Sequence, residues 1–160
     1  MEDNSCIPAY KSVTVGKDHV CAINYWNQLF CWGNNFNGQL GNDYTGHGVS
    51  DSKELIPARV NEDSWTLATV GEAHTCGISA LGEMLCWGYN YYGQVGNNES
   101  GPDKEVFQPV SIYPDNPATI SAGRNHNCSI DSGNKLYCWG WNNEGQLGNG
   151  AKTDMSSPSN

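Results

Sequence analysis

The sequence GEAHTCGISALGEMLCWGYNYYGQVG at residues 71–96 contains the pattern that decides the fold. It opens with Gly-x-x-His, has two cysteines separated by nine residues, and closes with Trp-Gly followed by Gly-Gln-x-Gly. The same pattern occupies residues 16–41 and 123–148 without a gap, so the segments start 55 and 52 residues apart. Self-similarity at such a period predicts a repeat architecture, in which each unit packs against the next.

Within each segment, short alternating apolar runs are separated by Gly, Asn and Asp, which is typical of strands and turns. In the first segment we expect residues 19–23 and 29–31 to form a hairpin, preceded by a strand at 12–15. Preceding strands are also expected at 66–70 and 118–122, and strands after a proline near 58–60 and 110–112.

The hairpin turns of the second and third segments contain Gly82 and Gly133, which can adopt the positive φ of a tight turn, and Asn27 takes this place in the first. Four short strands in about 50 residues form one propeller blade. The sequence therefore predicts an all-β fold of three propeller blades of short antiparallel strands. The blades are expected to form a single repeat domain, divided roughly into residues 2–56, 57–108 and 109–160.

Gly-x-x-His followed by Trp-Gly-x-Asn-x-x-Gly-Gln-Leu-Gly resembles the repeat of the regulator of chromosome condensation family. The resemblance covers nearly the whole chain and implies a β-propeller, commonly of seven blades. The cysteine pair in every repeat is closest to extracellular variants, such as the ectodomains of Crinkly-type plant receptor kinases. The nuclear founding member implies a different activity, guanine-nucleotide exchange on a small GTPase.

Six of the seven cysteines form three identical Cys-x9-Cys units. A hairpin closed by a short loop places Cys21 opposite Cys31 and Ile23 opposite Leu29, and opposed α carbons lie within disulfide range. Each bridge closes a small loop and contributes about 3 kcal/mol or less. We predict disulfides joining Cys21 to Cys31, Cys76 to Cys86 and Cys128 to Cys138.

Two alternatives for these cysteines are reduced core thiols and a metal site. His19, His74 and His126 each precede a cysteine by two residues on the same face of a strand. Zinc ligands usually stand closer in sequence, as in Cys-x2-Cys, so we expect no metal and no cofactor. Disulfides form in oxidising compartments, which predicts an extracellular protein, secreted or at the cell surface.

Cys6 remains unpaired in this scheme and is either a free terminal thiol or the site of an intermolecular bridge. Asn98-Glu99-Ser100 is a glycosylation sequon in a loop of variable length, and we predict a glycan on Asn98. Asn127-Cys128-Ser129 also matches, but it lies inside an expected strand.

The chain is acidic, with 8 Lys and Arg against 17 Asp and Glu and a net charge of -9. Too few cations are present to hold a phosphate backbone, so nucleic acid is not an expected partner. No apolar run approaches the roughly 18 residues of a membrane-spanning helix, and the first residues lack the character of a signal peptide. We therefore expect no membrane insertion, and a leader that is absent or already removed.

The histidines do not form a catalytic pattern. Three of the four recur at one repeat position, where a residue supports the blade, and His47 lies in a glycine-rich loop without a partner Ser or Asp. The acidic residues are scattered and form no calcium-binding loop. The sequence predicts a protein that is not an enzyme.

The four-residue spacer between Trp-Gly and Gly-Gln varies between the repeats and is rich in aromatic residues. Varied aromatic side chains beside turns are typical of a surface that binds protein or glycan, and the alternative is that these rings pack on the adjacent blade. The candidate binding residues are Phe36, Tyr89, Tyr91, Tyr92 and Trp141.

Three blades do not close a propeller, because closure needs about four to eight. The open blade faces predict further blades, from copies of this chain or from a longer chain. Head-to-tail contacts would build a closed ring or a filament, with Cys6 as a cross-link. The predicted function is a secreted, non-enzymatic structural or interaction module that self-associates. The alternatives are an exchange-factor-like propeller fragment and a lectin-like carbohydrate binder.

Overall fold

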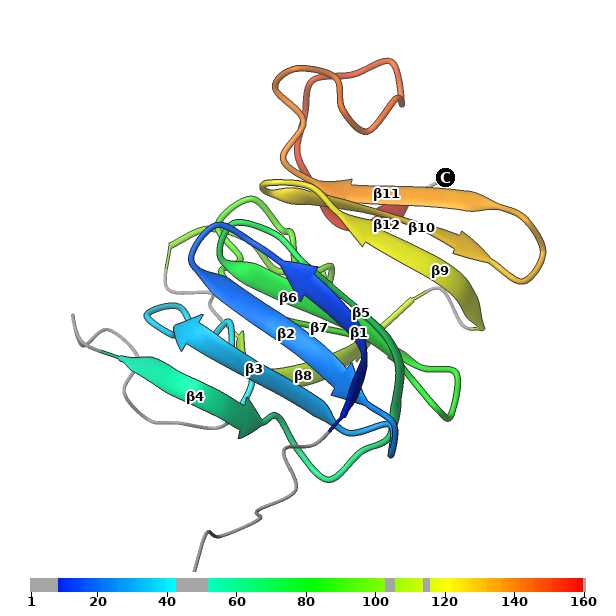
Figure 1. The fold of residues 1–160 in the computed structure, drawn as a ribbon. Helices are drawn as coiled ribbons and strands as arrows, with labels where there is room; N and C mark the ends of the chain where they lie inside the picture. Colours follow the sequence, from blue (N-terminus) through cyan, green and yellow to red (C-terminus); the bar gives the residue numbers. More distant parts are fainter. Residues whose placement is uncertain (1–8, 43–51, 103–105, 114–115, 160) are drawn as a thin grey trace, which may run out of the picture.

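The fold is all-β in the computed structural model, which describes residues 9–42, 52–102, 106–113 and 116–159. Those residues form three four-stranded antiparallel sheets and no helix. The sheets stand beside one another as separate blades (Figure 1). The predicted fold of three propeller blades is confirmed, and three blades make an incomplete propeller.

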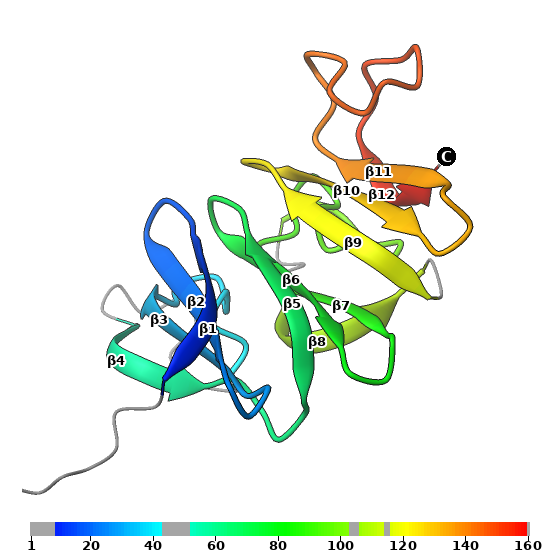
Figure 2. The same cartoon turned by 45° about the vertical axis from the view of Figure 1, so that its right-hand side comes forward.

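Each blade is built from four consecutive strands that pair in chain order. Strands β1, β5 and β9 begin the three blades, and β5 contacts both β1 and β9. Figure 2 shows these three strands along the side where the sheets approach one another. The strands are β1 (Tyr10–Val15), β2 (His19–Asn24), β3 (Leu29–Asn34), β4 (Lys53–Arg59), β5 (Trp65–Val70), β6 (His74–Ser79), β7 (Met84–Gly88), β8 (Val106–Ile112), β9 (Pro117–Ala122), β10 (His126–Asp131), β11 (Leu136–Gly140) and β12 (Met155–Ser159).

The strand that follows each variable loop belongs to the blade before it. Ala58 in β4 is opposite Cys31 in β3, and Val110 in β8 is opposite Cys86 in β7. These strands return antiparallel along the free edge of the hairpin and satisfy its hydrogen-bonding groups. The predicted limits at 56/57 and 108/109 therefore fall inside β4 and β8, and we propose to divide the blades after these strands.

The hairpins have the register expected from the cysteine spacing. Cys21 is opposite Cys31 and Ile23 is opposite Leu29, and the second and third hairpins repeat this arrangement. In all three, the paired cysteine α carbons are 4.1 Å apart and their sulfur atoms are bonded. Each blade is therefore closed internally by its own disulfide.

The turn of the third hairpin differs from expectation. Its left-handed residue is Asn134, with φ of 63°, and not Gly133. Asn134 matches Asn27 and Gly82, which have φ of 64° and 80°, because all three stand eleven residues after the opening glycine of their repeat. Asparagine tolerates this conformation, so the turn does not need a glycine there.

The apolar core lies between the blades as well as within them. One cluster joins the first disulfide to Trp65 and Trp87 of the second blade, and the other joins the second disulfide to Trp139 of the third. The indoles of Trp65, Trp87 and Trp139 are fully buried. Burial of large side chains across each junction couples neighbouring blades, so we expect them to unfold together.

Removing one disulfide tests the internal closure of a blade. We expect the double variant Cys76→Ala/Cys86→Ala to lose about 3 kcal/mol of unfolding free energy, because the unfolded chain is no longer constrained by a short loop. Both cysteines are fully buried, and alanine introduces no polar group. Urea unfolding of the variant and the parent measures the difference.

Non-reducing mass spectrometry of the parent provides the control, and three intact bridges within the repeats are the expected result. An unchanged urea midpoint in the double variant, or free thiols at all six positions in the folded parent, would contradict this account of the blades.

Candidate functional site

The junction between the first two blades is a hydrogen-bond relay. His19 Nε2 donates to Thr75 Oγ1 at 2.9 Å, and the Thr75 hydroxyl donates to the Gln39 carbonyl at 2.7 Å. Trp87 Nε1 donates to the same carbonyl at 3.0 Å. His19 and the Gln39 carbonyl therefore belong to the first blade. The Trp87 indole and Thr75, the residue after His74, belong to the second.

The second junction has the same design with different chemistry. His74 Nε2 donates to Asn127 Oδ1 at 3.0 Å, and Asn127 Nδ2 donates to the Gln94 carbonyl at 2.7 Å. Trp139 Nε1 donates to that carbonyl at 3.0 Å. The position after the repeat histidine was not among the predicted site residues, although the polar side chains of Thr75 and Asn127 there were the available signal.

Burial controls the protonation of the relay. Desolvation lowers the pKa of His19 to about 4, with a smaller contribution from nearby His74. It also lowers the pKa of His74 to about 4, against the opposing effect of the hydrogen bond to Asn127. Both rings are therefore neutral at pH 7 and hold their proton on Nε2, since both partners accept there.

The packing at each blade junction explains why the last residue of Gly-Gln-x-Gly is a glycine. Gly41 has φ of 68°, and a side chain at this position would contact the indole of Trp87. Gly96 approaches Trp139 in the same way. Trp32 of the first blade is only partly buried, because no preceding blade lies beside it in the part of the chain described.

The second residue of each loop that follows Trp-Gly is an asparagine, and its side chain shapes the turn. Asn35 Oδ1 accepts the backbone N–H of Leu40 at 3.0 Å. The other two buried asparagines, Asn90 and Asn142, accept from Val95 and Leu147 at 2.9 and 3.0 Å. These bonds fix the shape of each loop. Asn37, Tyr89 and Tyr92 of the first two loops lie on one face of the molecule, where they line a common cavity.

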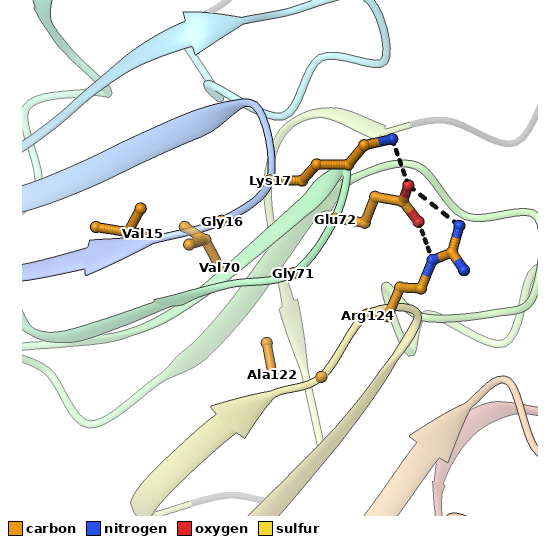
Figure 3. A pocket seen from close by; sticks show the side chains of 9 residues that line it. Val15, Gly16, Lys17, Val70, Gly71, Glu72, Ala122 and Arg124 are labelled. Atoms are coloured by element: carbon orange, nitrogen blue, oxygen red, sulfur yellow. Dashed lines mark hydrogen bonds and ion pairs between the residues drawn. The ribbon is translucent and has the colours of Figure 1, made fainter.

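A row of charges crosses this face at the position after the opening glycine of each repeat. Figure 3 shows Lys17 and Arg124 converging on the carboxylate of Glu72. Lys17 Nζ lies 2.8 Å from Glu72 Oε1, and Arg124 donates to both carboxylate oxygens. Hydrogen bonds from Arg124, and then Lys17, lower the pKa of Glu72 to about 2.

Two cavities flank these charges. The first, of about 510 Å³, lies at the ends of β1, β5 and β9. It is lined by Val15, Val70, Ala122 and the glycines that follow them (Figure 3). The second, of about 340 Å³, lies over the loops and is lined by the charged row, by Tyr89 and Tyr92, and by amide side chains.

Four of the five candidate aromatic residues gather in one cluster, which we call the tyrosine cluster. Its closest ring pair is Tyr91 and Tyr92, with centroids 5.0 Å apart, and Trp141 of the third blade lies 6.2 Å from Tyr92. Tyr89 stacks on Tyr91 at 6.3 Å. Phe36 is separate and lines a neighbouring depression with Leu55.

The remaining candidate residues are distributed as follows. Asn98 is exposed with φ of 67°, whereas Asn127 is fully buried within the second junction. Cys6 and His47 lie outside the described residues. Across residues 9–42, 52–102, 106–113 and 116–159, no group of three or more His, Cys, Asp or Glu could hold a metal ion. In those same ranges no helix is long and apolar enough to cross a membrane.

Comparison with known families identifies the repeat. The profile described as "Regulator of chromosome condensation (RCC1) repeat" matches residues 27–78, 82–130 and 134–160, and a second profile of that description matches 10–39, 67–94 and 118–146. The chain belongs to the RCC1 repeat family. The resemblance noted in the sequence is confirmed, and the relay, the glycines and the turn asparagines account physically for the residues that recur in this chain.

Several RCC1 relatives are similar over most of the chain. The ultraviolet-B receptor UVR8 of Arabidopsis thaliana is 30% identical over 92% of the chain, and the X-linked retinitis pigmentosa GTPase regulator of Mus musculus is 28% identical over 91%. The chain spans 33% and 14% of their lengths. Their activities as whole proteins therefore do not transfer directly.

Solved structures show the same fold. Prp20p of Saccharomyces cerevisiae superposes with a TM-score of 0.82 at 23% identity, covering 94% of this chain and 37% of its own. Human WBSCR16 gives 0.76 at 24% identity, covering 94% and 39%. The ectodomain of the Physcomitrella patens receptor kinase CR4 gives 0.54 at 19% identity, covering 93% and 35%.

Proposed function

We propose that these three RCC1-type blades act as an extracellular, non-enzymatic interaction module, secreted or at the cell surface. The observation that carries the proposal is the unfinished relay at the third blade. His126 is only partly buried. Gln146 occupies the repeat position of Gln39 and Gln94, whose backbone carbonyls each accept a hydrogen bond from an indole of the next blade. An incomplete set of junction groups is suited to receiving a further blade.

The disulfides support the extracellular setting. Every blade has one, and such bonds persist in oxidising compartments and are rare in the cytosol and nucleus. The exposed sequon at Asn98 is consistent with a secreted glycoprotein. The hydrogen bonds of His19 and His74 support a non-enzymatic role, because they commit both side chains to the blade junctions.

The further blades come either from a longer chain or from a second copy, and we propose head-to-tail self-association, which builds a ring or a filament. In such a contact the third blade of one copy meets the first blade of another. Trp32 of the second copy would donate to the Gln146 carbonyl. Val20 would meet His126, however, in the place that Thr75 and Asn127 occupy inside the chain.

This mismatch provides the test. We expect Val20→Thr to strengthen self-association about threefold to tenfold, because one recovered hydrogen bond contributes about 0.5–1.5 kcal/mol. Sedimentation equilibrium of the parent and the variant measures the change. Leu81→Thr introduces the same side chain on the hairpin turn of the second blade, away from the open faces of the first and third blades, and should have no effect because Leu81 is 85% exposed. A folded 17.4 kDa monomer at every concentration, in both proteins, would contradict self-association.

A second candidate is a fragment of a propeller that regulates a small GTPase. The similarity to the mouse GTPase regulator and to Prp20p favours it, since the structure of Prp20p was described together with its binding to Gsp1p and histones. RCC1 propellers thus bind partner proteins. Free thiols at the six paired cysteines in the native protein would favour this candidate over the extracellular module.

A further inference from the structure

We propose that the 340 Å³ cavity beside the tyrosine cluster binds a neutral glycan, with a hexopyranose ring lying against Tyr89 and Tyr92. This inference deepens the proposed interaction function and rests on it for the use of the loop face as a contact surface. It does not depend on self-association through the blade faces.

The cavity has one aromatic wall and one amide wall. The loop after β7 contributes Tyr89 and Tyr92. The last residue of β3, Asn34, and the loop after it contribute the amides of Asn34, Asn37 and Gln39. A tyrosine offers a flat apolar face and a polar hydroxyl, which matches a sugar ring that has C–H groups on its faces and hydroxyls around its edge. An amide offers both a donor and an acceptor to neighbouring hydroxyls.

The amide wall is ordered, yet it leaves hydrogen-bonding capacity. Gln39 Oε1 accepts the backbone N–H of Asn37 at 2.9 Å, which sets the position of the loop. The side-chain amide of Asn37 itself has no hydrogen-bond partner among the described residues, and neither has the Tyr92 hydroxyl. These two groups therefore can bind ligand hydroxyls without breaking an existing bond.

The aromatic wall is also held in place before any ligand arrives. Tyr92 contacts Tyr91 and Trp141, and its backbone N–H donates to Gln94 Oε1 at 2.9 Å. Because Trp141 comes from the third blade and Tyr92 from the second, the junction between those blades supports the wall. A ring that is already ordered loses little conformational entropy on binding.

The charges around the cavity favour a neutral ligand. Glu72 accepts hydrogen bonds from both Lys17 and Arg124, and Asp18 lies 3.9 Å from Lys17. The four side chains contribute two positive and two negative charges, all within ion pairs. An ionic ligand would have to compete with these pairs, whereas a hydroxylated neutral ligand would not.

The size of the cavity favours a small ligand over a protein surface. A volume of 340 Å³ is within the range of small-molecule pockets, about 300–1,000 Å³. A stable protein interface instead buries about 800 Å² on each partner. We therefore infer that the cavity binds the end of an oligosaccharide, either free or attached to another protein.

The test is a titration of the folded chain with cellotriose, chitotriose and mannotriose, followed by calorimetry and by tyrosine and tryptophan fluorescence. We expect at least one to bind with a Kd of about 1 mM or tighter. Tyr92→Ala and Asn37→Ala should each weaken binding about tenfold, and Tyr92→Phe should retain most of it because the ring remains. Tyr25→Ala, which removes a ring that is 69% exposed on a hairpin turn outside the cavity, is the matched control.

Three results would overturn the proposal. In the first, none of the three trisaccharides binds. In the second, the parent and the Tyr92→Ala and Asn37→Ala variants bind equally well. In the third, a sulfated oligosaccharide or a basic peptide binds more tightly than the trisaccharides at the same residues. Sedimentation in the absence of sugar reports separately on self-association. Failure of one proposal is therefore distinguishable from failure of the other.

Discussion

Acidification from pH 7 to pH 4 is expected to lower the free energy of unfolding by several kcal/mol through His19 and His74. Burial lowers the pKa of each ring from 6.5 to about 4. Between these values the unfolded chain binds protons that the folded chain does not, so stability falls as the pH falls and the effect ends below pH 4. Each ring contributes about 3 kcal/mol over this range.

Urea unfolding between pH 7 and pH 4.5 measures this effect, and His74→Gln isolates one ring. Glutamine can donate to Asn127 but does not titrate, so the variant should lose about half of the pH dependence. His126→Gln is the control, since His126 is only partly buried and should contribute less. An unchanged pH dependence in His74→Gln would refute the assignment. Glu72, with a pKa lowered from 4.5 to about 2, acts in a separate window below pH 4.5.

Trp87→Ala is expected to destabilise the protein by about 3–5 kcal/mol, the usual cost of removing a large buried aromatic side chain. The indole is fully buried at the first junction, its centroid lies 5.6 Å from that of Trp65, and its N–H donates to the Gln39 carbonyl. The substitution leaves a cavity between two blades and removes a donor from a buried carbonyl. Urea unfolding measures the loss.

Trp26→Ala is the matched control for this substitution, because Trp26 is 63% exposed on a hairpin turn. We expect it to change stability by no more than about 0.5 kcal/mol. Trp32→Ala should lie between the two, since Trp32 holds the same repeat position as Trp87 without a preceding blade beside it. If Trp87→Ala were as mild as Trp26→Ala, the packing of blades through this indole would not be a major source of stability.

The sequence alone was sufficient for the features that are local along the chain. Alternating apolar residues and a short turn set the hairpin register, so the pairing of Cys21 with Cys31 followed from their spacing. The same reasoning was less reliable at the turn of the third hairpin, where Asn134 and not Gly133 is left-handed. Two adjacent residues can both suit a turn, and only the backbone geometry distinguishes them.

The candidate site was only partly predictable. The variable spacers indicated which aromatic residues were of interest, but not that Tyr92 and Trp141 meet across a blade junction while Phe36 lies apart. The charged row was not predicted, because Lys17, Glu72 and Arg124 are more than 50 residues apart in sequence and meet only when the blades are placed side by side.

The sequence by itself determined the repeat, the three hairpins and the sulfur pairs, because each hairpin and its disulfide depend on residues close together in the chain. It did not predict β12, or the part of β4 that precedes Pro57. Tertiary structure alone decided that β4 and β8 complete the preceding blades, and that the residue after each repeat histidine connects one blade to the next. The physical reason is the rotation between neighbouring blades. It brings a histidine, a hydroxyl or amide and a backbone carbonyl within hydrogen-bond distance, and no spacing along the chain specifies that rotation.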